Sequence, residues 1–136
     1  MNFTPYLTFN NNCAEAMAFY ANVFGGEVTA MQTFGKSALA VNLPAEMHDL
    51  VMHASLRIGD QVIMASDDPS GNYTPPRGIQ VQTGLPDFTT AQRVFDALAM
   101  GGEVKMPFEA TPVTSGFGMV RDRFGIPWMV NCDAPI

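Results

Sequence analysis

Three side chains that can do chemistry alternate along one predicted strand. In LVMHASLRIG, residues 50–59, the side chains of His53, Ser55 and Arg57 fall on one face of an extended chain. The other face, from Met52 to Ile58, is apolar, so we expect it to pack under a helix and to turn the polar face into an open cleft. An imidazole and a guanidinium there can hold an anionic or carbonyl-bearing ligand, with His53 as candidate general base. The alternatives are a histidine bonded within the sheet or at a dimer interface, and an arginine that is a surface charge.

Amide and thioether side chains supply further candidates for ligand contacts. Gln80 and Gln82 alternate with Ile79 and Val81, so they face either a cleft, where amides orient ligands, or solvent. Methionine fills irregular gaps in cores but also makes adaptable binding walls. The candidates for a soft wall against an apolar or aromatic ligand are Met64 and Met129, and further Met31, Met106 and Met119.

The elements that must position these residues come from an internal repeat. FYANVFGGEV (19–28) matches FDALAMGGEV (95–104) at six positions in ten after a shift of 76 residues. In each copy a predicted helix ends at Gly-Gly, because glycine adopts the left-handed conformation of a helix C-terminus. We predict that Asn12, with Glu15 three residues on, caps the first helix and that Asp87 caps the second. Ala16, Phe19, Tyr20 and Val23 form the first apolar stripe, and Ala91, Val94, Phe95 and Leu98 the second.

The remaining segments predict strands, which gives each half the order β-α-β-β-β. They are 4–9, 27–34, 50–59 and 61–66 in the first half, and 78–84, 103–109, 117–122 and 126–132 in the second. Gly59-Asp60 predicts a tight hairpin. The chain is thus predicted to be one α+β domain of two tandem modules, 1–66 and 78–136, joined by a Pro- and Gly-rich linker at 67–77. Together they are expected to form a curved eight-stranded sheet with a concave cleft and with the helices on its outer face.

This chain resembles the PhnB-like group of the vicinal-oxygen-chelate superfamily, which includes glyoxalase I, extradiol dioxygenases and bleomycin-binding proteins. The matching pieces are 6–28, 52–68, 95–107 and 117–132. The resemblance implies the paired-module fold. It also implies metal-ligand positions at about Pro5, Met64, Gly78 or Gln80, and Met129. Proline has no ligand atom and a thioether is a poor ligand for hard divalent ions, so no metal and no other cofactor are expected at these positions.

Two further segments are given structural roles. Asp122 to Gly125 is interpreted as a turn that aims the last strand, and Trp128 as a core residue. Cys13 lies at a predicted helix N-terminus, where the pKa of a thiol can be lowered. No base is implied beside it, so we interpret it as a packing position.

Composition limits the partners. The 136 residues carry a net charge of −6, which disfavours nucleic acid. No apolar segment is long enough to span a bilayer, and no basic run suggests a membrane anchor. Two widely spaced cysteines and no signal-peptide pattern favour the cytoplasm. Open sheet edges favour a homodimer, and so does the resemblance, because members of that family commonly form dimers.

The function expected from these observations is binding of a small apolar or carbonyl-bearing molecule in the cleft, without a tightly held metal. Sequestration of an aromatic compound, as by bleomycin-binding proteins, is one version. The alternative is a glyoxalase- or dioxygenase-like enzyme. It would use His53 as base, or a metal held by His48 or His53 with Glu109 or Asp133. A third possibility is an interaction module whose cleft has no ligand.

Overall fold

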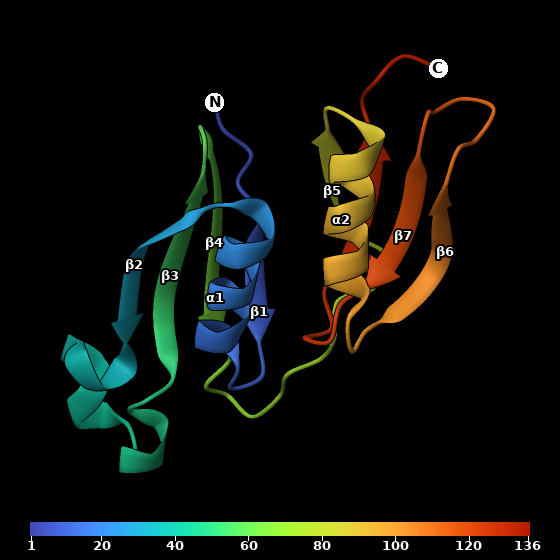
Figure 1. Cartoon of the computed structure of the whole chain (residues 1–136). Helices are drawn as coiled ribbons and strands as arrows, with labels where there is room; N and C mark the ends of the chain where they lie inside the picture. The colour runs from blue at the N-terminus through green and yellow to red at the C-terminus, as the bar shows by residue number, and fades with distance from the viewer. The chain divides into compact units, whose positions relative to one another are not determined.

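The computed structural model describes all residues, 1–136, as two compact units, Met1–Thr74 and Pro75–Ile136. Each unit is a βαβββ module with a four-stranded sheet (Figure 1). The first contains β1 (Tyr6–Phe9), α1 (Cys13–Phe24), β2 (Glu27–Thr33), β3 (Val51–Ile58) and β4 (Gln61–Asp67). The second contains β5 (Val81–Leu85), α2 (Phe88–Ala99), β6 (Glu103–Glu109), β7 (Phe117–Arg121) and β8 (Pro127–Cys132). The predicted pair of βαβββ modules is confirmed, and the boundary falls inside the predicted linker.

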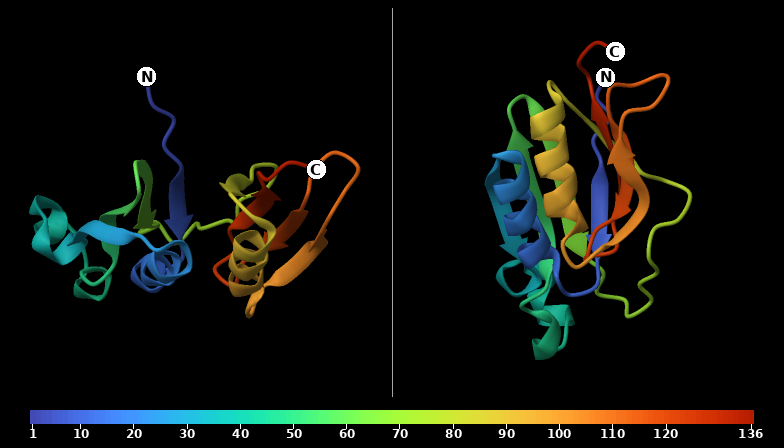
Figure 2. Two further views of the ribbon diagram at one scale, coloured as in Figure 1. Left: turned by 45° about the horizontal axis from the view of Figure 1, so that its top comes forward. Right: turned by 45° about the vertical axis from the view of Figure 1, so that its right-hand side comes forward.

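The two sheets have the same topology. Their strand orders are β1-β4-β3-β2 and β5-β8-β7-β6. The first strand of each module runs parallel to the last, and the other neighbours are antiparallel. The eight strands thus form two four-stranded mixed sheets, while the shared concave cleft stays a prediction. One helix packs along one face of each sheet, which leaves the other face open (Figure 2).

The core of each module lies between helix and sheet. The predicted stripe on α2 is confirmed, since Ala91, Val94, Phe95 and Leu98 are all buried. On α1 the stripe is partly different, because Met17 is fully buried and Phe19 is only half-buried. Both helices have 12 residues, and no helix combines the length and apolar character needed to cross a bilayer.

The first helix begins differently from the prediction. Asn12 makes no capping bond with its side chain, so the predicted capping box is wrong. The buried carboxylate of Asp67 instead accepts from the backbone N–H of Cys13 at 3.0 Å and from that of Val51 at 2.9 Å. This one side chain at the end of β4 therefore ties the start of α1 to the start of β3. The predicted cap of α2 is confirmed: Asp87 accepts from the N–H of Thr90 at 2.7 Å.

Glycine ends α1 as predicted, with Gly25 in the left-handed conformation at φ 69°. In the second module α2 ends at Ala99, and the left-handed glycine, Gly101, comes one residue after the C-cap Met100. The Gly59-Asp60 hairpin joins β3 to β4 as predicted. The largest difference in strand bounds is at β5, which begins at Val81 rather than at residue 78, so Gln80 precedes the strand.

Asp122 organises the turn before β8, as its sequence indicated. Its buried carboxylate accepts from the backbone N–H of Phe124 at 2.9 Å and of Ile126 at 3.0 Å. It also accepts from the indole Nε1–H of Trp128 at 2.8 Å. Trp128 is 1% exposed, so its predicted core position is confirmed.

Candidate functional site

The open face of the first module carries the predicted catalytic residue. His53 lies on β3 with its side chain half-buried, and its ring centroid is 6.1 Å from that of Tyr6 on β1, with the rings tilted by 34°. Ser55 pairs in register with Met64 on β4, and Met64 pairs with Tyr6. The structure therefore brings His53, Ser55 and Met64 together on one face. The alternation of residues in the sequence did not predict that Tyr6 would lie beside His53.

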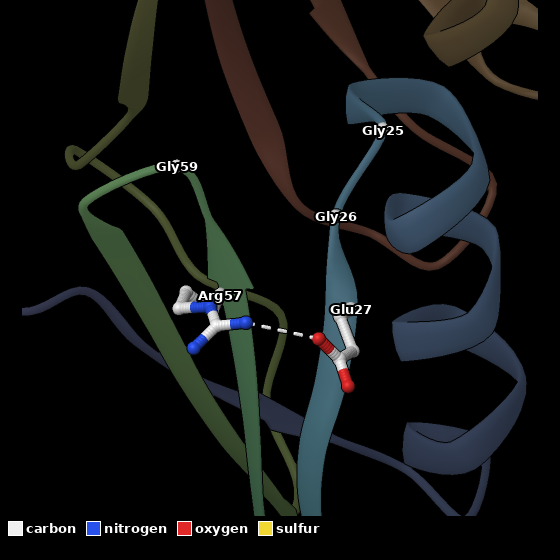
Figure 3. A pocket seen from close by; sticks show the side chains of 5 residues that line it. All are labelled: Gly25, Gly26, Glu27, Arg57 and Gly59. Atoms are coloured by element: carbon white, nitrogen blue, oxygen red, sulfur yellow. Dashed lines mark hydrogen bonds and ion pairs between the residues drawn. The ribbon is translucent and has the colours of Figure 1, made fainter.

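Arg57 points from the same strand toward a carboxylate at the sheet edge. Its Nη2 lies 3.0 Å from Oε2 of Glu27, and both side chains are largely exposed, at 56% and 69%. Both residues line a shallow crevice of about 420 Å³, together with Gly25, Gly26 and Gly59. Figure 3 shows the ion pair between β2 and β3, near the end of α1 and the β3–β4 hairpin. The guanidinium of Arg57 is therefore already paired within the protein, and such exposed pairs contribute little to stability.

The other histidine of the chain is engaged within a loop. Three short 3-10 helices connect β2 to β3: η1 (Phe34–Lys36), η2 (Ala38–Asn42) and η3 (Ala45–Met47). Nε2 of His48 lies 3.0 Å from the carbonyl oxygen of Ala40 and 3.1 Å from that of Leu43. This bonding gives His48 a structural role in the loop.

The open face of the second module carries a row of methionines. Gln82 on β5 pairs in register with Met129 on β8, Met129 with Met119 on β7, and Met119 with Met106 on β6. Paired residues on neighbouring strands share a face, so these four side chains form one line across the sheet. We call Met106, Met119 and Met129 the methionine row. They are half-buried or exposed, and their register places them next to one another on the open face.

A small pocket of about 280 Å³ adjoins the methionine row. Its lining residues are Gln80, Lys105, Met119, Val120, Arg121, Pro127 and Trp128. Arg121 pairs in register with Pro127, two residues along β7 from the Met119–Met129 pair. The guanidinium of Arg121 donates to the carbonyl oxygens of Gly125 at 2.6 Å and Pro76 at 3.2 Å. The pocket thus combines an apolar wall with two cations and an amide.

Of the residues predicted to bind ligand, Gln80, Gln82 and Met129 lie on this face or in this pocket. Lys105 and Arg121, which also line the pocket, were not predicted from the sequence. The signal was available for Arg121, because it follows Met119 by two residues on a strand and therefore shares its face. Lys105 gave no signal, because β6 has an irregular register between Val104 and Met106.

The structure also fixes the residues beside the implied metal-ligand positions. Pro5 precedes β1, and the residue that pairs with Met64 is Tyr6. The residue that pairs with Met129 is Gln82, two positions beyond Gln80. No group of three or more His, Cys, Asp or Glu side chains that could hold a metal is present in either module.

Cys13 differs from what its place at a helix N-terminus allowed. Burial, with a smaller contribution from the carboxylate of Asp67, raises the pKa of its thiol from 9.0 to about 12. The lowering that a helix N-terminus can cause therefore does not occur, because desolvation and the neighbouring negative charge both disfavour the thiolate. The interpretation of Cys13 as a packing residue agrees with its complete burial.

Comparison with known proteins places this architecture in a family. A family model described as 3-demethylubiquinone-9 3-methyltransferase matches residues 1–131. Protein YjdN of Escherichia coli (strain K12) is 35% identical over 139 residues, which cover 96% of this chain and 95% of YjdN. The crystal structure of protein PA1353 from Pseudomonas aeruginosa is 41% identical, with a TM-score of 0.90 and coverage of 99% of both chains.

Two further structures extend the comparison. A Bacillus cereus protein described as a putative 3-demethylubiquinone-9 3-methyltransferase, PhnB protein, is 25% identical with a TM-score of 0.83, over 97% of this chain and 99% of that one. A glyoxylase/bleomycin resistance protein/dioxygenase domain from Frankia sp. EAN1pec shares the fold, with 12% identity and a TM-score of 0.69 over 97% and 90% of the chains. The resemblance stated from the sequence is thus confirmed. The chain belongs to the PhnB-like family, described as 3-demethylubiquinone-9 3-methyltransferase, and has the fold of the glyoxalase, bleomycin-resistance and dioxygenase proteins.

Proposed function

We propose that this protein binds a small, largely apolar organic molecule on the open face of its second module. The single observation that carries the proposal is the methionine row beside a pocket of about 280 Å³. Flexible thioethers adapt to flat apolar and aromatic bodies, while a few polar groups fix orientation. Gln82 at one end of the row and Gln80 in the pocket supply amides for a ligand's oxygen atoms.

The family description supports the same class of ligand. It names a methyltransferase acting on 3-demethylubiquinone-9, and a quinone is a ring that carries oxygen atoms. From that description we carry over only the class, an oxygen-bearing ring of apolar character. Binding of this class needs no tightly held metal.

The proposal is tested with protein labelled with ¹³C at the methionine methyl groups. Titration with a neutral aromatic probe, 2-naphthamide, is expected to shift the signals of Met106, Met119 and Met129. The signal of Met17, a fully buried residue of α1 in the first module, is the internal control and should stay in place. Shifts confined to other methionines, or no shifts at all, contradict the proposal.

The second candidate function is catalysis on a small carbonyl compound with His53 as general base. It is favoured by the position of His53 on an open sheet face beside Tyr6, with Ser55 two residues further along the strand. If the protein is such an enzyme, His53→Ala abolishes turnover of the carbonyl substrate found by screening. If it is a binding protein, the variant keeps the methionine shifts seen with 2-naphthamide.

The metal-dependent version is tested separately by metal analysis. Protein purified without chelator and offered Ni, Zn, Mn and Fe is expected to retain less than about a tenth of an equivalent after desalting, because real protein sites hold such ions tightly. Near one equivalent of any metal overturns the metal-free proposal, and His48 and His53 are then the first ligands to replace.

We further propose that the protein is a cytoplasmic homodimer. Each sheet ends in two edge strands, β1 and β2 in one and β5 and β6 in the other. Unpaired edges favour association with a second copy. A monomer mass by light scattering at the working concentration would overturn the dimer.

A further inference from the structure

The two modules place the same pair of charged residues in register but use them differently. Glu27 pairs with Arg57 across β2 and β3, and Glu103 pairs with Arg121 across β6 and β7. In the first module the two side chains form an ion pair at 3.0 Å. In the second module the carboxylate of Glu103 lies 2.9 Å from Nζ of Lys105 instead. Glu103 thus forms its ion pair with Lys105, whereas the corresponding Glu27 forms its ion pair with Arg57.

Arg121 is left with a charge that no carboxylate balances. It is half-buried, and its guanidinium donates two hydrogen bonds, to the neutral carbonyl oxygens of Gly125 and Pro76. It forms no ion pair within the protein. Because a guanidinium has five N–H donors in a rigid fork, donors remain after these two bonds. A partly desolvated cation without a counterion attracts an anion more strongly than a fully solvated one does.

Lys105 adds a second positive charge to the same pocket. Its ion pair with Glu103 is exposed, with 48% of the lysine side chain and 66% of the glutamate side chain accessible. Exposed pairs of this kind are weak, so the ammonium group can turn toward a ligand at little cost. The pocket is thus lined by the guanidinium of Arg121, the ammonium of Lys105 and the amide of Gln80.

We propose that the ligand of the second module is a small apolar acid whose carboxylate sits in this pocket against Arg121, Lys105 and Gln80. Met119 precedes Arg121 by two residues on β7, a spacing of about 7 Å along a strand. The apolar body of the ligand then lies over Met119 and Met129 while its anionic end reaches Arg121. This inference rests on the proposed function, because it assigns the charge of the molecule that the methionine row binds.

The experiment compares two probes with one apolar body, 2-naphthoate and neutral 2-naphthamide. Dissociation constants come from the methionine methyl shifts of the whole chain. We expect the wild type to bind naphthoate about ten- to a hundredfold more tightly than naphthamide, as charged hydrogen bonds allow. Added salt should weaken binding of naphthoate and leave that of naphthamide nearly unchanged.

Substitutions locate the charge that is responsible. In Arg121→Gln the preference for naphthoate is expected to disappear, while naphthamide binds as before. Arg121→Lys should keep part of the preference, because it keeps the charge but loses the fork. The matched control is Arg93→Gln. Arg93 is an exposed residue of α2, on the other side of the same sheet, so this variant also loses one positive charge but should keep the preference for naphthoate.

Each result has a defined meaning. The ratio of the two constants reports on charge recognition, so a variant that loosens the turn at Gly125 and weakens both probes equally does not imitate the expected result. Equal binding of the two probes by the wild type, or an unchanged ratio in Arg121→Gln, overturns the acid ligand and leaves the proposed function standing. If neither probe shifts the methionine row, the proposed function itself fails.

Discussion

Replacing Asp122 by asparagine should destabilise the second module by an amount that its hydrogen bonds determine. The carboxylate accepts three bonds of 2.8–3.0 Å from buried donors, two in the backbone and one in the indole of Trp128. The amide of asparagine carries no negative charge, so all three hydrogen bonds lose their charge assistance. Its NH₂ group also replaces one acceptor oxygen and leaves at least one of the three donors unpaired. Lost charge assistance and one unpaired donor together predict a loss of about 2–5 kcal/mol. Since the free energy of unfolding of a domain is about 5–15 kcal/mol, the variant should still fold but should unfold at a lower midpoint concentration of urea.

The role of the indole is isolated by a double-mutant cycle. Trp128→Phe removes the Nε1–H donor, so Asp122→Asn should cost about 1–3 kcal/mol less in that background. All four proteins are unfolded in urea and followed by far-UV circular dichroism, because the phenylalanine variants lack the only tryptophan. The matched control is Asp96→Asn on α2, where the carboxylate accepts one bond from Gln92 at an exposed site. There the change should lie within about 0.5 kcal/mol.

Two results would refute this account of Asp122. One is a cost for Asp122→Asn as small as that for Asp96→Asn, which would mean that the buried bonds contribute no net stability. The other is the same cost with and without the indole N–H, which would mean that Trp128 is not coupled to the carboxylate.

Three further predictions follow from other buried or capped positions. The pKa of Cys13 is raised from 9.0 to about 12, so the folded state keeps the thiol proton at a pH where the unfolded chain loses it. The contribution of the protonated thiol to the free energy of unfolding is therefore complete below pH 9 and is lost as pH rises toward 12. Urea titrations should therefore show a wild-type advantage over Cys13→Ala that shrinks between about pH 8 and about pH 10.5; a constant difference contradicts it. The backbone N–H of Thr90, and then its hydroxyl, lowers the pKa of Asp87. The carboxylate thus stabilises the fold above pH 3.8 and less as pH falls through the lowered value, so wild type and Asp87→Asn should converge in acid, not diverge. Gly118→Ala should cost about 1–3 kcal/mol in the same urea assay, because a Cβ would lie 2.7 Å from the ring of Phe95; an unchanged midpoint would mean that the core yields freely.

The sequence by itself determined the modules and most of their surfaces. The repeated Gly-Gly, the 3.6-residue stripe on α2 and the two-residue alternation on β3 are local patterns, and local geometry alone converts them into elements and faces. The same rule placed His53 and Ser55 on the open face. Asp87 was found as a cap because its partner, Thr90, lies three residues away.

Only the tertiary structure decided which distant groups meet. The N-terminus of α1 is satisfied by Asp67, 54 residues away from Cys13, and no spacing rule connects them. The start of β5 depends on its pairing with β8, so the residue beside Met129 is Gln82. Arg57 and Arg121 look alike in sequence, yet one has a carboxylate partner and the other has only carbonyl oxygens. Glu103, which pairs in register with Arg121, forms its ion pair with Lys105 instead, and the choice between these two cations exists only once β6 and β7 are paired.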